Sequence, residues 1–514
     1  MANKVVLGNF STMLSRTKAV LAQGKRIQSP FLGATALKVF KDAIADGRRL
    51  LPSRYQKRYV DVLEQVVQQA ELVLLSLHPR DGSGRRIVFE QLQSVFSIVA
   101  APIVQLRSHE HERELKAFLA EISNIYRRFI NDDQVQKGAK FNILSPDLDP
   151  LGAFGYDEAG PFTLPASSDL PVALVFKPAN EMGFLPLWAA DGHEVGGHDI
   201  YGAVQGYEQD LTRALEANLR AAFRSGRIKT SVSKVSIPIR GGIFSRRTRS
   251  LSMEDFMVRV WKAWLNEANA DHAGLLNIGP MYLDSLILLT SALRTGDKLS
   301  ADSVFDLSLF GGSSGFAPHP IDVVRALLGI EAIKLLSFGD GAAYAKALTD
   351  RLTVNQGGAL PSTVGWLDQK RSRVITVAVA DFQAVLPVVA ETLLKTRLPA
   401  LANQAFGDII NWLDEDEKIV RAQAPKLTAG DTQVGEEVEA RHVVAASMLA
   451  LENASTGQDF VRKSAVVHDT GITILKDMYD HQCLLCSISG SAGSGLGAAP
   501  VVNLTRLFKH VRSR

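Results

Sequence analysis

Residues 191–198 read Asp-Gly-His-Glu-Val-Gly-Gly-His, and this stretch says most about the fold and the chemistry of the chain. We interpret it as the His-Glu-x-x-His motif of zinc hydrolases. In that motif two histidines four residues apart share one face of a helix, so both imidazoles can reach one cation while the glutamate lies beside them. On this interpretation His193 and His198 bind Zn²⁺, and Glu194 acts as the general base.

A third metal ligand is expected from residues 266–271, Asn-Glu-Ala-Asn-Ala-Asp, which lie in a helical pattern. Glu267 and Asp271 share a helix face, where two acids repel each other by about 0.2–0.5 kcal/mol unless a cation makes use of them. We expect Glu267 to complete a His2Glu ligand set. We expect Asp271 to accept the remaining ring N–H of His193 or His198. An exposed acidic pair is the alternative.

Two glycines lie at variable positions inside the motif. Gly196 and Gly197 each cost up to about 1 kcal/mol relative to alanine in a helix. Glycine at such a position indicates that another segment approaches closely. We expect the helix that carries Glu267 to cross over these glycines, which would bring its carboxylate within reach of the metal.

The downstream motifs extend this interpretation to a family. The chain resembles the gluzincin metallopeptidases, and most of all the CAAX-prenyl-protease type, which includes bacterial membrane proteases of the heat-shock kind. These proteins follow His-Glu-x-x-His with Glu-x-x-Ala-Asp, here residues 267–271, and with His-Pro and a later Arg, here residues 319–325. The resemblance covers residues 170–335 and implies a zincin-like core that hydrolyses peptide bonds. It also implies that His319 and Arg325 position substrate or stabilise an oxyanion, although a helix-start proline beside a satisfied histidine is the alternative.

The resemblance does not extend to the membrane. Proteins of that type are usually embedded in a bilayer, whereas no apolar run in this chain reaches the length of about 18 residues that spans one. We therefore predict no integral membrane association and a cytoplasmic location. The first 41 residues contain seven Lys and Arg and no acid. Such a bias can mark an organelle transit peptide, but we favour a basic surface helix.

The composition suits a globular protein of several structural units, because 514 residues exceed the size of one hydrophobic core. The net charge of +3 gives no electrostatic argument for binding nucleic acid. Two cysteines, Cys483 and Cys486, cannot form a disulfide framework, and we expect a buried structural pair.

Helical spacing of apolar residues dominates the chain. We predict a mainly α fold with a small β-sheet, that is, an α+β zincin-like core between helical N- and C-terminal regions. The expected units are a helical region at 1–141, the metallopeptidase core at 142–340, a helical region at 341–486, and a flexible linker with a basic tail at 487–514.

Two segments have the pattern of strands, residues 172–176 and residues 232–240. The first precedes the motif helix, which is expected to begin near Pro186. Strand followed by motif helix is the chain order of a zincin active site. We expect the strand at 172–176 to pair with an extended substrate along a free edge.

These expectations combine in a zinc-dependent metallopeptidase that acts on a peptide or protein. Charge on the tetrahedral intermediate would be stabilised by zinc and a nearby donor, with His319, Arg325, Tyr282 and Tyr201 as candidates. Two alternatives stay open. One is a zinc hydrolase that cleaves a non-peptide amide or ester, and the other is a helical scaffold or binding protein that keeps a non-catalytic zincin core.

Overall fold

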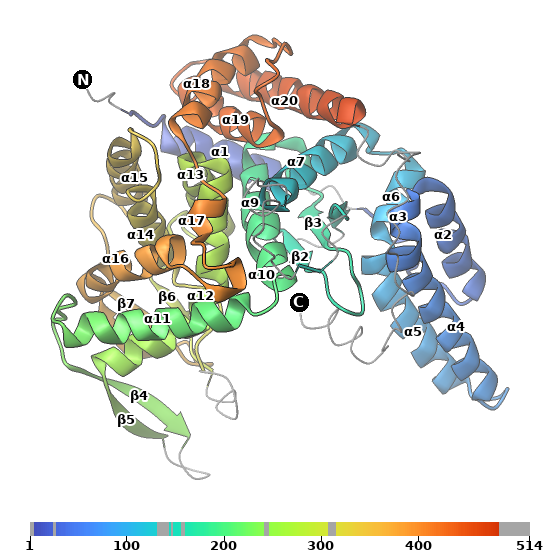
Figure 1. Ribbon diagram of the computed structural model, residues 1–514, viewed down its shortest axis with the longest axis horizontal. Coiled ribbons are helices and arrows are strands. Elements are labelled where there is room, and N and C mark those ends of the chain that lie inside the picture. The colour runs from blue at the N-terminus through green and yellow to red at the C-terminus, as the bar shows by residue number, and fades with distance from the viewer. Residues whose placement is uncertain are drawn as a thin grey trace.

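The computed structural model describes residues 5–23, 27–130, 143–144, 148–155, 160–240, 246–306 and 315–482. The two cysteines and the predicted linker and basic tail at 487–514 lie outside the described residues. Within them the chain forms many helices and three small sheets (Figure 1). The prediction of a mainly α fold with a small β component is confirmed.

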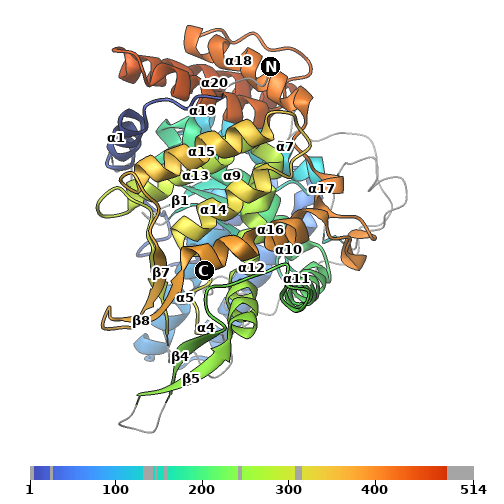
Figure 2. The same cartoon turned by 90° about the vertical axis from the view of Figure 1, so that its left-hand side faces the viewer.

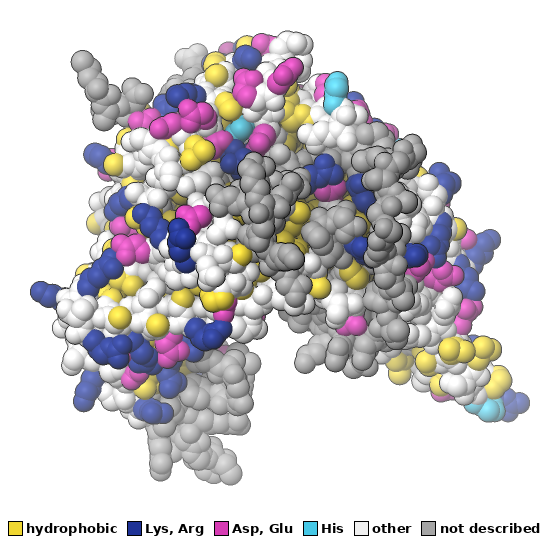
Figure 3. All heavy atoms as spheres, in the orientation of Figure 1, with side chains coloured by type: hydrophobic (Ala, Val, Ile, Leu, Met, Phe, Trp, Pro, Cys, Tyr) yellow, Lys and Arg dark blue, Asp and Glu magenta, His cyan; other side chains and the backbone are white. Residues whose placement is uncertain are grey.

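Part of the N-terminal region forms a helical arm with a hydrophobic core of its own. Its helices are α2 (Leu37–Leu50), α3 (Ser53–Tyr55), the π-helical η1 (Gln56–Val60), α4 (Asp61–Ser76), α5 (Gly82–Val99) and α6 (Ala101–Ser108). Helices α4 and α5 form a hairpin, and α5 begins where the Asp81 carboxylate accepts the Gly84 N–H at 2.8 Å. The hairpin projects from the body, and hydrophobic side chains gather at its end (Figures 1 and 3).

A three-stranded sheet lies between the arm and the body. Its order is β1 (Leu151–Gly155), β3 (Leu174–Pro178), β2 (Phe162–Leu164), with β3 parallel to β1 and antiparallel to β2. Alternate side chains of β3 face opposite ways, so Leu174 and Phe176 join the core of the arm while Val175 joins that of the body.

The predicted strand at 172–176 is therefore confirmed with a shift of two residues. It is the central strand, however, and Leu174–Phe176 pair with a neighbour on each side. The prediction of a free edge at this strand is wrong.

The second hydrophobic core belongs to the body and extends over most of the chain. Its central helices are α12 (Met253–Ile278), α13 (Pro280–Leu293) and α14 (Asp322–Ile333). Around them lie α1 (Phe10–Leu21), α7 (Glu112–Ile130), α11 (Tyr207–Arg224), α15 (Gly341–Asn355), α16 (Val379–Lys395), α17 (Phe406–Ile409), α18 (Asp414–Ala429), α19 (Ala440–Ala454) and α20 (Phe460–Gln482). The expected boundaries near residues 142 and 341 thus do not coincide with boundaries between hydrophobic cores.

Two further sheets lie at the edge of the body, and both views show the hairpin of the first projecting from it (Figures 1 and 2). Strands β4 (Lys234–Arg240) and β5 (Arg246–Ser252) form that antiparallel hairpin, which confirms the strand predicted at 232–240. The other sheet has the order β6 (Asp302–Val304), β7 (Thr363–Leu367), β8 (Arg373–Ala378).

Residues 374–378 lie in the region expected to be helical, 341–486, but they form part of β8 because a run of β-branched side chains favours a strand. Among the described helices, none is by itself long and apolar enough to cross a bilayer. The pair α5 and α6 passes that test only when both helices are taken together across a bend of 63°.

Candidate metal centre

The metal motif lies on an irregular helix. The chain passes from a 3-10 helix, η3 (Leu185–Ala190), through α9 (Asp191–His193) and a π-helical turn, η4 (Glu194–Asp199), into α10 (Ile200–Ala203). The helical segment begins near Pro186, as predicted. Its π-helical turn, which the sequence did not indicate, decides where the two histidines point.

The spacing of the histidines corrects the sequence interpretation. His193 and His198 are five residues apart, so the chain carries His-Glu-x-x-x-His, and the assignment to His-Glu-x-x-His is wrong by one residue. On a regular α-helix, five residues would turn the two side chains about 140° apart. A π-helix, which has about 4.4 residues per turn, reduces this angle to about 50°. The π-helical turn therefore absorbs the additional residue and returns both imidazoles to one side.

Helix α12 crosses directly over this turn. A Cβ placed at Gly197 would lie 2.4 Å from the Cα of Ala270, and one placed at Gly192 would lie 3.1 Å from the Cα of Gly274. The prediction that the glycines admit the helix of Glu267 is confirmed. The start of α12 is fixed by Ser252, whose hydroxyl accepts the Asp255 N–H at 3.0 Å.

The crossing brings Glu267 against both imidazoles. Nε2 of His193 lies 3.4 Å from Oε2 of Glu267, and Nε2 of His198 lies 3.5 Å from Oε1. All three residues are buried, with exposed fractions of 7%, 5% and 8% for His193, His198 and Glu267. In a tetrahedral zinc site with bonds of about 2.0–2.1 Å, the ligand atoms lie about 3.3–3.4 Å from one another. The observed distances fit such a site.

Glu194 belongs to the same cluster. It is buried, and one of its carboxylate oxygens lies within 4.8 Å of a ring nitrogen of each histidine. The buried group of His193, Glu194 and His198 could therefore hold a metal ion. Two carboxylates, one from the π-helical turn and one from α12, thus lie beside the pair of imidazoles.

Both imidazoles are held at the opposite ring nitrogen by side chains of α12. Nδ1 of His193 lies 2.9 Å from Oδ1 of Asp271, and Nδ1 of His198 lies 3.1 Å from Oδ1 of Asn266. An N–H at each Nδ1 leaves each Nε2 with a lone pair that can bind a metal. The predicted contact of Asp271 is present at His193. Asn266 was not predicted, although its position directly before Glu267 is a signal for it.

Arg325 and Tyr282 lie behind Asp271. The guanidinium of Arg325 donates from Nε and Nη2 to the two Asp271 oxygens at 2.6 Å each, and the Tyr282 hydroxyl donates to Oδ1 at 2.5 Å. Arg325 also places Nη2 3.3 Å from Nδ1 of His193. Both residues were expected as donors to a substrate oxyanion, whereas here they hold the carboxylate that supports His193.

The other two expected donors differ in their surroundings. The ring of Tyr201 packs against that of Tyr207, with 5.2 Å between centroids, and its side chain interacts with Glu208 and Thr212. The His319 side chain is 64% exposed, and its Nδ1 lies 3.8 Å from Oε1 of Glu267. His319 thus combines proximity to Glu267 with access from solvent.

The carboxylates of the cluster are ionised while His193 is protonated at neutral pH, so a metal at its Nε2 would displace a proton. Burial raises the pKa of Glu267, but His193, His198 and His319 outweigh burial and hold that pKa well below its usual range. Burial also raises the pKa of Asp271, and Arg325 together with His193 more than reverses this effect. Burial lowers the pKa of His193, yet the carboxylates of Asp271 and Glu267 raise it to about 9. The site therefore presents ionised carboxylates to any cation between the two imidazoles.

A second buried charged cluster adjoins the metal turn. Nζ of Lys177 lies 2.7 Å from Oδ2 of Asp191, and Glu121 and Glu181 complete the cluster, with all four side chains at most 1% exposed. Burial raises the pKa of Glu181 to about 8, because the opposing effect of Lys177 is smaller and Asp191 and Glu194 raise the pKa further. Glu181 is therefore protonated at neutral pH.

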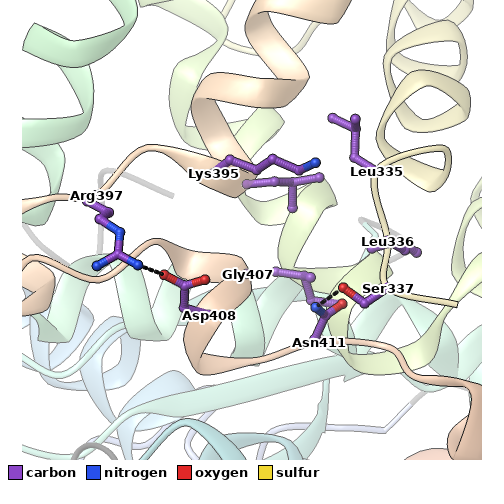
Figure 4. A pocket seen from close by; sticks show the side chains of 10 residues that line it. Leu335, Leu336, Ser337, Lys395, Arg397, Gly407, Asp408 and Asn411 are labelled. Carbon is purple, nitrogen blue, oxygen red and sulfur yellow. Dashed lines mark hydrogen bonds and ion pairs between the residues drawn. The ribbon is translucent and has the colours of Figure 1, made fainter.

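Two surface pockets among the described residues lie away from this cluster. One pocket of about 280 Å³ lies among the ends of α14, α16 and α17, and Figure 4 shows that polar side chains in it pair with each other. Arg397 approaches Asp408 at 3.6 Å, and Asn411 donates to Ser337 at 2.8 Å. None of the residues that line this pocket belongs to the cluster on the metal turn. The chemistry therefore points to the histidine cluster rather than to the pocket.

Comparisons of the chain with protein-family models, with curated proteins and with solved structures gave no match.

Proposed function

We propose that this chain is a zinc-dependent hydrolase, specifically a metallopeptidase. The observation that carries the proposal is the convergence of two imidazole Nε2 atoms on the two oxygens of one buried carboxylate. The proposal keeps the resemblance to the gluzincins, although the first motif is one residue longer here than in that family. The resemblance then depends on residues 267–271 and 319–325.

In this proposal His193, His198 and Glu267 bind the zinc. Both Glu194 and Glu267 are near enough to serve as the third ligand, but each oxygen of Glu267 faces one Nε2. In addition, α12 fixes both imidazoles through Asn266 and Asp271. Glu267, which lies between these two residues on the same helix, is thereby held at the metal position. Glu194 is then available for proton transfer.

Bound zinc supplies a Lewis acid that polarises a carbonyl and lowers the pKa of water. The Glu194 carboxylate takes the proton of the attacking water and passes it to the leaving amine. The exposed His319 donates an N–H to the developing oxyanion. Asp271, kept ionised by Arg325, fixes the tautomer of the His193 ring.

The sheet beside the site contacts the metal turn. Strand β2 is its edge strand, and the Thr163 hydroxyl donates to the Asp199 carboxylate in that turn. Thr163 and Leu164 are fully buried, so this edge is covered, and the preference for a peptide substrate rests on the resemblance to the gluzincins. Cleavage of a non-peptide amide or ester uses the same ligands and remains the competing substrate class.

Metal analysis of the purified protein and of two variants tests the ligand assignment. We expect about one zinc per chain in the wild type and in Glu194→Gln, and a strong loss of zinc in Glu267→Ala. Equal zinc in all three proteins would contradict the assignment. With zinc retained, Glu194→Gln should lose hydrolysis, and a panel of peptides beside acyl esters should show activity on the peptides. Activity on the esters alone would exclude the peptidase.

A further inference from the structure

The end of the helical arm carries an exposed apolar patch. We define the tip patch as Leu72, Val73, Leu75 and Ile87, around the turn between α4 and α5. Their exposed fractions are 67%, 44%, 81% and 51%. Apolar side chains exposed together at the end of a projection mark a candidate contact surface. Figure 3 shows hydrophobic side chains gathered at the far end of the arm.

Two exposed basic side chains lie close to the tip patch in the sequence, Arg80 and Arg86, and Arg86 pairs with Glu90 at 3.2 Å. The arm as a whole, residues 27–108, contains eleven Lys and Arg against seven Asp and Glu. An apolar patch on an arm with a net positive charge matches a surface that is apolar inside and anionic outside.

A second projection is also basic. Residues 224–252, which run from the end of α11 through β4 and β5, contain eight Lys and Arg and no Asp or Glu. We define the basic ribbon by four exposed cations, Arg224, Lys229, Lys234 and Arg249; Arg227 is also exposed but pairs with Glu391 at 2.7 Å. Figure 3 shows Lys and Arg side chains gathered over α11 above this hairpin.

Both projections point toward the same end of the molecule, the lower edge of Figures 1 and 2. The arm and the hairpin therefore lie at one end of the molecule. A lipid bilayer has an apolar interior for the tip patch and phosphate groups for the cations.

We propose that this end of the chain binds the surface of an anionic lipid bilayer. The tip patch enters the boundary between headgroups and acyl chains, and the basic ribbon faces the lipid phosphates. A second copy of the chain suits the tip patch less well, since a stable dimer buries about 800 Å² on each partner. A nucleic acid would engage the basic ribbon and leave the tip patch without a role. This inference does not depend on the proposed hydrolase activity.

Co-sedimentation of the full-length protein with vesicles tests the proposal. We expect binding to phosphatidylcholine vesicles that contain about 30% phosphatidylserine, weak binding to phosphatidylcholine alone, and a decrease as salt is added. Leu72→Ser with Leu75→Ser should weaken binding at least tenfold. Lys229→Gln, Lys234→Gln and Arg249→Gln together should weaken binding about fivefold for each removed charge.

Matched variants on the opposite side of the molecule serve as controls. Val354 and Val461 are each 64% exposed on α15 and α20, and Val354→Ser with Val461→Ser should bind vesicles like the wild type. Circular dichroism should show that every variant is folded. Three results would overturn the proposal: no binding to the anionic vesicles, equal losses in the tip and control variants, or a dimer that the tip variant abolishes while vesicle binding is absent. Binding of duplex DNA without binding of vesicles would also overturn it.

Discussion

Replacing Gly197 with alanine tests whether the close crossing of α12 sets the geometry of the metal centre. The new Cβ would lie 2.4 Å from the Cα of Ala270 and 2.5 Å from its Cβ. Carbon atoms in contact prefer about 3.5–4.0 Å, so the two segments must separate by about 1 Å. Crowding of this kind costs about 1–3 kcal/mol, and the better helix propensity of alanine returns up to about 1 kcal/mol. We expect a net loss of stability between about 0 and 3 kcal/mol.

The effect on zinc should be larger than the effect on folding. Glu267 lies three residues before Ala270 on α12, so a shift of this helix moves the carboxylate away from both imidazoles. A displacement of about 1 Å exceeds the tolerance of about 0.2 Å for a metal–ligand distance. We expect the zinc affinity of Gly197→Ala to fall at least tenfold. Competition with a chelator measures the affinity, and urea unfolding of the metal-free protein measures the stability.

Two other glycines provide a graded comparison. A Cβ at Gly196 would meet Nδ2 of Asn277 at 2.5 Å, but this is the end of a side chain that can turn. A Cβ at Gly183 would meet nothing within 4 Å. The loss of zinc affinity should therefore decrease from Gly197→Ala through Gly196→Ala to Gly183→Ala. The reasoning is refuted if Gly197→Ala binds zinc as tightly as Gly183→Ala does.

Five further variants test other contacts in the centre and in the charged cluster beside it. Asn266→Ala should weaken zinc binding about 10–100-fold with little change in stability, as measured by chelator competition. Asp271→Asn should weaken zinc binding similarly and destabilise the fold by about 3–5 kcal/mol in urea unfolding, because the charge of Arg325 loses its buried partner. Adding Arg325→Met to Asp271→Asn should restore stability but not zinc affinity. Recovery of both would contradict the role of Asp271 in supporting His193. His319→Ala should keep zinc and lower kcat about 10²–10³-fold, whereas unchanged turnover would remove it from the mechanism. Glu181→Gln tests how the free energy of unfolding depends on pH. The folded protein holds a proton up to a pKa of about 8 that the unfolded chain releases near 4.5, so stability falls as pH rises through this window. Glu181→Gln should remove up to about 5 kcal/mol of this loss of stability between low and high pH. Identical pH profiles of stability for the wild type and the variant would contradict the raised pKa of Glu181.

The sequence predicts the helices well and the short strands less well, for reasons of local pattern. Helix α12 has apolar residues at helical spacing, a serine cap and two acids in its first turn, so several local signals agree. Strand β1 reads Leu-Gly-Ala-Phe-Gly, which has two glycines and no β-branched residue. It is a strand because β3 pairs with it and because two cores cover its faces. Such pairing joins residues that are distant in the sequence and leaves no mark in the local pattern.

For the site, the sequence identifies which residues come together but not the directions in which their side chains point. His193, His198, Glu267 and Asp271 come together as the spacing suggests, yet the role expected for Arg325 changes. An arginine that follows a His-Pro pair can point toward a substrate or toward a buried acid. The choice depends on how α14 packs against α12, which is decided by the tertiary structure and not by the local spacing.

The π-helical turn shows how two histidines five residues apart can still face one position. Metal binding requires that the two Nε2 atoms point at one position, and it does not require a fixed number of residues between the histidines. Helix α12 is regular and presents Asn266, Glu267 and Asp271 from one side, so it defines that position independently of the motif. The segment with the additional residue then adapts by taking about 4.4 residues per turn. Glycines at 196 and 197 allow this adaptation, because the wider turn lies directly against α12 where a side chain would collide.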